Sequence, residues 1–382
     1  MYITKDIRKY MVDVRRQLHE YPELSWKEQH TSELILQELD QMGVNGYRVC
    51  GTGILALIEG ADKTHTVGLR ADIDALPVQE QTGLDYASRR EGVMHACGHD
   101  FHIAMLLGAA KRLKNLQRQL PCNVLLMFQP AEEWIAESGA AHMMQLSEVQ
   151  QLSAITGLHI WNDLPVGKVC VQPGVLMAAA DTFDLTVVGK GGHGANPQSV
   201  VDPIIVGAQI VNGMQTLVSR ENIPTKPLVI SICSFQSGDC ANVIPDAAML
   251  QGTVRSTEES VRESLPGRIE DMVRGICQAY RASYKWKYER GTLLVDNQQD
   301  ISQYAKEIMK EIVGPDGLQK LPVQMIGEDF SKYQKSIPGV FVLLGGNDGV
   351  HHSPHHSSTF QLSEKAMPYG AEYFVRFCMN YI

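Results

Sequence analysis

The chain has 382 residues, a length that predicts two to three domains. Its 34 basic and 43 acidic side chains give a net charge of −9, and a surface of that sign repels phosphate backbones, which argues against a nucleic-acid-binding protein. Hydrophobic residues make up 44% and charged residues 20%, so long disordered regions are also disfavoured.

Helical and strand-like segments alternate along the first part of the chain. Apolar residues at helical spacing predict helices over 7–20, 31–42 and 101–116, with Asp100 as the N-cap of the third. Apolar runs predict strands over 54–58, 65–70, 123–128 and 154–160. This alternation indicates an α/β fold with a mostly parallel sheet flanked by helices.

The pattern changes near Asp181. Strands are predicted over 182–190, 228–235, 247–255 and 283–289, with helices over 203–218 and 258–282. The order strand-helix-strand-strand-helix-strand is that of a ferredoxin-like α+β domain. A helix over 301–312 and a strand over 340–344 then return to the first sheet. We therefore expect one domain from residues 1–180 and 295–382, interrupted by an inserted domain of residues 181–294.

No apolar run approaches the ~18 residues that cross a bilayer, and the first residues mix charges without an apolar core. We therefore expect no membrane partner and a cytoplasmic location. The eight cysteines are scattered without a CxxC pair, so we expect them to be reduced. Cys97 differs from the others because histidines flank it.

Five segments concentrate the side chains that bind metals. They are 70–77 (RADIDALP), 95–100 (HACGHD), 129–133 (QPAEE), 157–161 (GLHIW) and 351–356 (HHSPHH). Each alone has an ordinary explanation, such as a core histidine, a solvated glutamate pair or a histidine-rich loop. Three of them follow or lie in predicted strands, however, and sites in α/β sheets collect beyond the carboxyl ends of strands. Together they predict a metal site.

These segments together resemble a known family of metallo-amidohydrolases and peptidases. The family includes aminoacylases, hippurate hydrolases, indoleacetyl-amino-acid hydrolases and N-acetyl-diaminopimelate deacetylases. Segment 94–102 (MHACGHDFH) is the most specific match, and segments 15–24, 191–195, 242–245 and 328–331 extend the resemblance over nearly the whole chain. The resemblance implies a catalytic domain with an inserted lid or dimerisation domain, in agreement with the predicted elements.

The resemblance also implies a site for two divalent metal ions. By motif position its ligands are Cys97 as the bridge, His99, Glu133, His159 and a histidine near the C-terminus. We choose His356 for the last ligand because it keeps the family's spacing to Phe360, with His352 and His355 left open as alternatives. Sulfur and imidazole ligands favour zinc, and the resemblance adds manganese, cobalt and nickel.

Other residues match positions that have roles in catalysis in this family. Glu132 is implied to be the general base, and Asp74 is implied to orient a metal ligand, with Asp72 a weaker candidate for that region. His193 resembles a histidine that stabilises the oxyanion across a dimer. Asn242 and Arg255 match positions that bind the substrate carboxylate.

The implied reaction is hydrolysis of an N-acyl amino acid, such as an N-acetyl or N-benzoyl derivative, to a free amino acid and a carboxylate. The implied assembly is a homodimer formed through the lid domain. A dipeptidase or aminopeptidase is the close alternative, and a non-catalytic metal-dependent binding protein is the distant one. The segment 134–138 makes the loop after Glu133 longer and bulkier than the family pattern, so the acyl group and the amino acid stay open.

Overall fold

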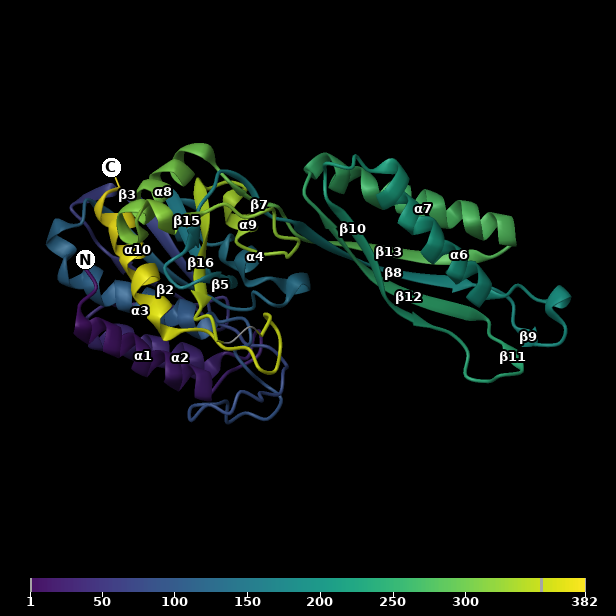
Figure 1. Cartoon of the computed structure of the whole chain (residues 1–382), viewed down its shortest axis with the longest axis horizontal. Helices are drawn as coiled ribbons and strands as arrows, with labels where there is room; N and C mark the ends of the chain where they lie inside the picture. The colour runs from purple at the N-terminus through teal and green to yellow at the C-terminus, as the bar shows by residue number, and fades with distance from the viewer. Residues whose placement is uncertain (1, 351–352, 382) are drawn as a thin grey trace. The chain divides into compact units, whose positions relative to one another are not determined.

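The computed structural model describes residues 2–350 and 353–381, which divide into two compact units (Figure 1). Unit 1 contains residues up to Leu176 together with 296–322 and the described residues from Asp329 onward. Unit 2 contains Met177–Val295 and Val323–Glu328. The sequence analysis placed this last segment in the first domain, but the Ala178 N–H donates to the Gln324 carbonyl at 2.8 Å and joins it to unit 2.

Unit 1 is built on an eight-stranded mixed sheet in the order β1-β2-β4-β3-β5-β16-β6-β15. Its strands are β1 (Gly46–Val49), β2 (Gly53–Ile58), β3 (Asp62–Asp72), β4 (Cys122–Gln129), β5 (Ala154–Pro165), β6 (Val169–Cys170), β15 (Leu318–Gln319) and β16 (Gly339–Asn347). The four central strands β4, β3, β5 and β16 are parallel, which confirms the predicted fold class. A separate two-stranded sheet consists of β7 (Gly174–Met177) and β14 (Val295–Asn297).

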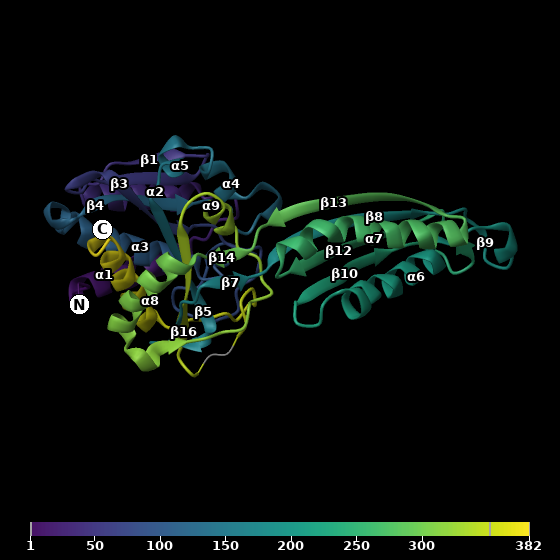
Figure 2. The ribbon, with the colours of Figure 1, turned by 90° about the horizontal axis from the view of Figure 1, so that it is seen from above.

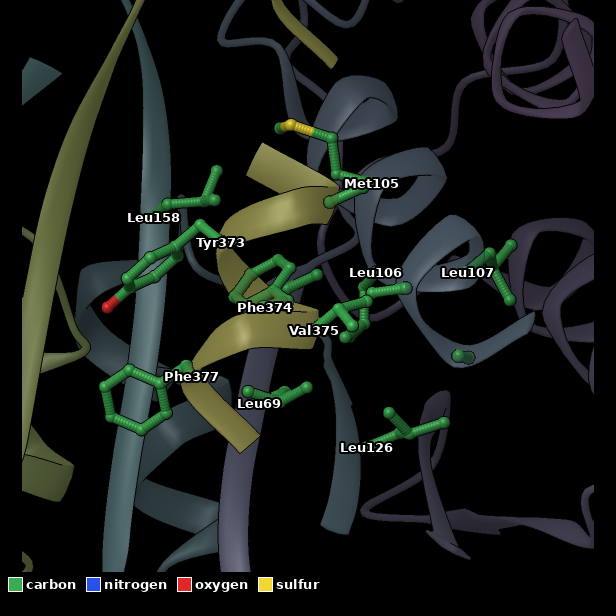
Figure 3. Packing of buried hydrophobic residues seen from close by; sticks show 14 of the residues in the cluster. Leu69, Met105, Leu106, Leu107, Leu126, Leu158, Tyr373, Phe374, Val375 and Phe377 are labelled. Atoms are coloured by element: carbon green, nitrogen blue, oxygen red, sulfur yellow. The ribbon is translucent and has the colours of Figure 1, made fainter. Parts of the chain in front are cut away.

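The longer helices of unit 1 are α1 (Lys5–Glu20), α2 (Gln29–Gln41), α3 (His99–Asn115), α8 (Gln299–Val313) and α10 (Met367–Met379), and shorter ones are α4 (Gly139–Met143), α5 (Ser147–Gln150) and α9 (Ser331–Gln334). Alternate residues of the central strands face one apolar cluster with the longer helices. In Figure 3, Phe374 and Val375 of α10 lie beside Leu106 of α3. No helix among the described residues is long and apolar enough to cross a membrane.

The start of α3 differs from the prediction. Its N-cap is Gly98, in a left-handed conformation with φ 94°, and not Asp100. Asp100 lies inside the helix and is fully buried, where its carboxylate accepts hydrogen bonds from Arg15 Nε and His19 Nδ1, both at 2.8 Å. This carboxylate therefore ties α1 to α3 instead of capping a helix.

Unit 2 has the element order predicted for a ferredoxin-like domain. Its four-stranded antiparallel sheet runs β10-β12-β8-β13, with β8 (Ala179–Val188), β10 (Leu228–Gln236), β12 (Ala247–Ser256) and β13 (Ser283–Thr292). Helices α6 (Pro203–Thr216) and α7 (Glu259–Tyr280) cover one face of this sheet (Figure 2). A two-stranded sheet of β9 (Gly192–His193) and β11 (Val243–Ile244) extends from the ends of β8 and β12.

A buried ion pair connects α7 to the sheet of unit 2. The Asp181 carboxylate accepts hydrogen bonds from Arg262 Nε at 3.1 Å and Nη2 at 2.7 Å, and from Tyr288 Oη and the Gly291 N–H at 2.9 Å. Both charged side chains are at most 2% exposed. Each charge therefore depends on the other for its stabilisation inside the unit.

We expect Asp181→Asn to destabilise unit 2 by about 3–5 kcal/mol, because it removes the buried counter-charge of Arg262 and leaves only the exposed Glu259 carboxylate, 3.8 Å from Arg262 Nη1. Hydrogen exchange of β8 and β13 in increasing urea measures this loss. The control is Asp184→Asn in the same strand, whose carboxylate is partly exposed and accepts a single bond from Gln251. Equal protection in the two variants would contradict the prediction.

Candidate metal centre

The segments rich in ligand-type residues meet at one edge of the central sheet in unit 1. Asp72 ends β3, Gln129 ends β4, His159 lies in β5 and His99 begins α3. In each of three groups of possible ligands, the ligand atoms lie within 4.8 Å of one another. They are Cys97 with His99 and His159, Cys97 with Glu133 and His356, and His99 with Glu132 and Glu133. The structure thus brings together all five predicted ligands and the predicted base.

Two histidines have their ring nitrogens fixed by backbone carbonyls. His99 Nδ1–H donates to the Asp74 carbonyl at 2.9 Å, and His159 Nδ1–H donates to the Ile160 carbonyl at 2.7 Å. In each ring Nε2 is consequently the nitrogen available to bind a cation. A histidine that binds a metal commonly has its other nitrogen held by such an acceptor.

Cys97 belongs to two of these three groups, one with His99 and His159 and one with Glu133 and His356. Its Sγ is 3.3 Å from His159 Nε2. Burial and the nearby Glu133 and Glu132 carboxylates raise the pKa of the Cys97 thiol well above its usual range. A cation that binds here must therefore displace the thiol proton, as metal-binding thiols require.

The turn after β4 explains how two successive glutamates face the same site. In an extended strand, neighbouring side chains point to opposite faces. Ala131, directly before the pair, has φ 50°, a left-handed conformation that reverses the chain. Glu132 Oε2 then lies 4.0 Å and Glu133 Oε1 3.8 Å from His99 Nε2.

The structure distinguishes two of the three candidates for the last ligand. His356 Nε2 lies 3.4 Å from Glu133 Oε1, with the His356 N–H donating to the Ala96 carbonyl at 2.9 Å. His355 Nε2 instead accepts the Asn162 N–H at 3.2 Å, and its ring packs between Trp161 and Phe360. These contacts favour His356. The third candidate, His352, lies outside the described residues.

A layer of buried polar residues supports the ligands. Asp74 Oδ2 accepts from Ser25 Oγ at 2.7 Å and from the Glu133 N–H at 3.0 Å. Burial alone would lower the pKa of His99, but the Asp72 and Asp74 carboxylates outweigh it and raise that pKa to about 10. The site therefore has an excess of negative charge that favours a cation.

His102 also belongs to this supporting layer, although its position in the sequence did not single it out. Its Nδ1–H donates to Asp72 Oδ1 at 2.5 Å, and its Nε2 accepts the Ile160 N–H at 2.9 Å. Asp72 also accepts from Arg70 Nη1 at 2.7 Å. The three-residue spacing from His99 on a helix was the available signal, because it places both rings on one side.

The residues in this site fit a pair of divalent cations. His99 Nε2 and Glu133 Oε1 are buried without a hydrogen-bond partner in the described structure. Buried polar atoms are rarely left without a partner, so these two atoms indicate an additional ligand. A thiol, imidazoles and carboxylates form the donor set that zinc and similar transition metals prefer.

The three residues that the sequence assigned to the lid domain lie in unit 2, at two separate places. His193 pairs with Val243 across β9 and β11, and Asn242 accepts the Gly194 N–H on its carbonyl at 2.8 Å. Arg255 lies at the opposite end of β12, eight residues from Ala247, which is about 27 Å along a strand. One copy of unit 2 therefore cannot bring Arg255 together with His193.

Known proteins that are similar in sequence identify the family of this chain. The model of peptidase family M20/M25/M40 matches residues 68–380. The N-acetylcysteine deacetylase of Bacillus subtilis is 38% identical over 368 residues, which cover 95% of this chain and 94% of that protein. Thermostable carboxypeptidase 1 of Saccharolobus solfataricus is 36% identical over 374 residues, covering 96% and 94%.

A solved structure from the same family is also similar to this chain over nearly its whole length. The YxeP protein of Bacillus subtilis, described as a dinuclear metal-binding peptidase of the M20 family, superimposes with a TM-score of 0.84 at 36% identity and covers 98% of each chain. The family match spans most of the chain, and the relatives align over nearly their full lengths. The family expected from the motifs is thereby confirmed: this chain is a hydrolase of peptidase family M20/M25/M40.

Proposed function

We propose that this protein is a metal-dependent amidohydrolase that cleaves N-acyl amino acids to a free amino acid and a carboxylate. The observation that carries the proposal is the position of Glu132, whose Oε2 lies 4.0 Å from His99 Nε2 among the candidate ligand atoms. A carboxylate in that position is suited to proton transfer. The relative that is an N-acetylcysteine deacetylase supports the substrate class.

The proposed ligands for two divalent ions are Cys97, His99, Glu133, His159 and His356. When bound, such ions polarise the amide carbonyl and lower the pKa of a bound water. Zinc is the cation favoured by the sulfur and imidazole donors, with manganese, cobalt and nickel as further candidates.

Glu132 transfers a proton from the attacking water to the leaving amine. It accepts a proton from the attacking water and gives it to the amine nitrogen as the amide C–N bond breaks. The carbonyl carbon retains the water oxygen and leaves as the carboxylate, while the amine leaves as the free amino acid. Asp74 orients His99 through its backbone carbonyl and holds the Glu133 N–H through its side chain.

We further propose that the protein acts as a homodimer through unit 2. His193 would stabilise the oxyanion, and Asn242 and Arg255 would bind the substrate carboxylate. Arg255 lies about 27 Å along β12 from Ala247, at the end of the strand remote from His193 and Asn242, so a second chain would supply one part of this set. The cytoplasmic location stays a prediction.

A carboxypeptidase is the second candidate function, because one relative carries that name. The substrates share an acylated amine and a free carboxylate, so the same residues serve both. An aminopeptidase needs in addition a group for a free α-amine.

A hydrolysis screen tests the proposal. The purified chain is incubated with zinc, manganese, cobalt or nickel and with N-acetyl amino acids, N-benzoyl amino acids, N-blocked dipeptides or free dipeptides. We expect cleavage of acylated substrates, and weak cleavage of the same compounds with the carboxylate converted to an amide. Preferential cleavage of free dipeptides, or no cleavage with any cation, would overturn the proposal.

A further inference from the structure

The backbone that presents Glu132 and Glu133 has an unusual conformation. Ala131 has φ 50°, a region that residues with a Cβ rarely occupy. The loop that follows folds back onto this residue, and the Gly139 N–H donates to the Ala131 carbonyl at 3.1 Å. A disfavoured conformation of this kind persists only where surrounding contacts fix it.

Glu28, just before α2, makes one of these contacts. Its Oε1 accepts the Ala131 N–H at 2.9 Å, and its Oε2 accepts from Thr52 Oγ1 at 2.6 Å. The side chain is 0% exposed. In the described part of the chain these side-chain partners are a backbone N–H and a hydroxyl, and neither is cationic.

A buried carboxylate without a cationic partner is unfavourable for folding alone. Glu28 belongs to none of the groups of possible ligand atoms in the described residues, so metal binding does not explain it either. Its hydrogen bond instead fixes the N–H of the residue that directs the two following glutamates. The companion bond, from the Glu133 N–H to Asp74, fixes the other side of the same turn.

We propose that Glu28 is a positioning residue that holds Ala131 in its left-handed conformation and thereby directs Glu132 and Glu133 toward one site. This inference rests on the proposed function of those two glutamates. A side-chain oxygen of Glu28 holds the turn because it accepts the Ala131 N–H. The negative charge of Glu28 is not required.

The test compares Glu28→Ala with Glu23→Ala. Glu23 is a second buried carboxylate of the same segment, and it accepts the Thr31 N–H at 2.9 Å without touching Ala131. Two quantities are measured: binding of Co²⁺ to the metal-free protein by visible absorption, and kcat and KM for an N-acyl amino acid.

For Glu28→Ala we expect Co²⁺ affinity and kcat each to fall about 10–100-fold, as for other supports of a metal ligand, with KM nearly unchanged. Glu23→Ala should lose thermal stability but keep Co²⁺ affinity and kcat close to wild type. Glu28→Gln, which retains an oxygen acceptor, should stay within a few-fold of wild type. The Glu28→Ala effect should shrink to a few-fold in an Ala131→Gly background, because glycine adopts positive φ readily.

Equal effects of Glu28→Ala and Glu23→Ala, or a Glu28→Gln loss as large as that of Glu28→Ala, would overturn the inference. If Glu28→Ala does not fold, recovery of folding by Ala131→Gly supports it, and an unfolded double variant beside a folded Ala131→Gly variant contradicts it. A wild-type protein that neither binds Co²⁺ nor cleaves any substrate would instead overturn the proposed function.

Discussion

Replacing Glu132 by Gln is expected to lower kcat for amide hydrolysis by about 10²–10⁴-fold while Co²⁺ binding is retained. The amide has nearly the shape of the carboxylate but cannot accept the proton of the attacking water. Glu132 is also buried, so bulk water is poorly placed to replace it. Steady-state kinetics and Co²⁺ absorption of the same preparations measure the two effects.

The neighbouring residue supplies the control. Glu133→Gln changes the same chemical group one position further, where the side chain lies 3.4 Å from His356 Nε2. It should weaken Co²⁺ binding and reduce activity together. Full activity of Glu132→Gln would exclude Glu132 as the base, and loss of Co²⁺ binding by Glu132→Gln would reassign it as a ligand.

Removal of divalent cations by a chelator is expected to abolish hydrolysis, and their return should restore it. The candidate ligands alone cannot acidify a water molecule or polarise a carbonyl to the extent that cations do. Activity is assayed before dialysis against a chelator, after it, and after addition of each of the four cations. Reversibility distinguishes loss of the cation from denaturation.

Two cysteine variants sharpen this prediction. Cys97→Ser should reduce cation affinity and activity, since a serine hydroxyl loses its proton to a bound cation much less readily than a thiol does. Cys233→Ser replaces an exposed cysteine of unit 2 and should change neither. Full activity in chelator-treated protein, confirmed free of metal, would rule out the proposed mechanism.

Much of the fold follows from local patterns in the sequence. The helices α1, α2, α3 and α8 have apolar residues at helical spacing and the central strands are continuous apolar runs, so their residues identify them without tertiary information. The order of elements in unit 2 likewise predicts its sheet. The candidate site was predictable because its ligand types lie at strand ends and helix starts.

Features that depend on tertiary contacts were not predictable. Helix α10 is buried on most sides and includes Gly370, which has a low helix propensity, so local propensity does not identify it. The left-handed turn at Ala131 has no glycine to indicate it. Spacing to Phe360 favours His356, but the contact that occupies His355, with the Asn162 N–H, is tertiary and sequence spacing does not reveal it.

The backbone carbonyls that hold His99 and His159 also determine what happens when the cations dissociate. Each ring keeps its proton on the nitrogen that faces the carbonyl, so no tautomer exchange is needed when a cation returns. Both imidazoles are therefore pre-organised, and little conformational entropy is lost on metal uptake. Uptake of cations is then coupled to release of protons from Cys97 and His99, whose pKa values the site raises, rather than to refolding of the protein.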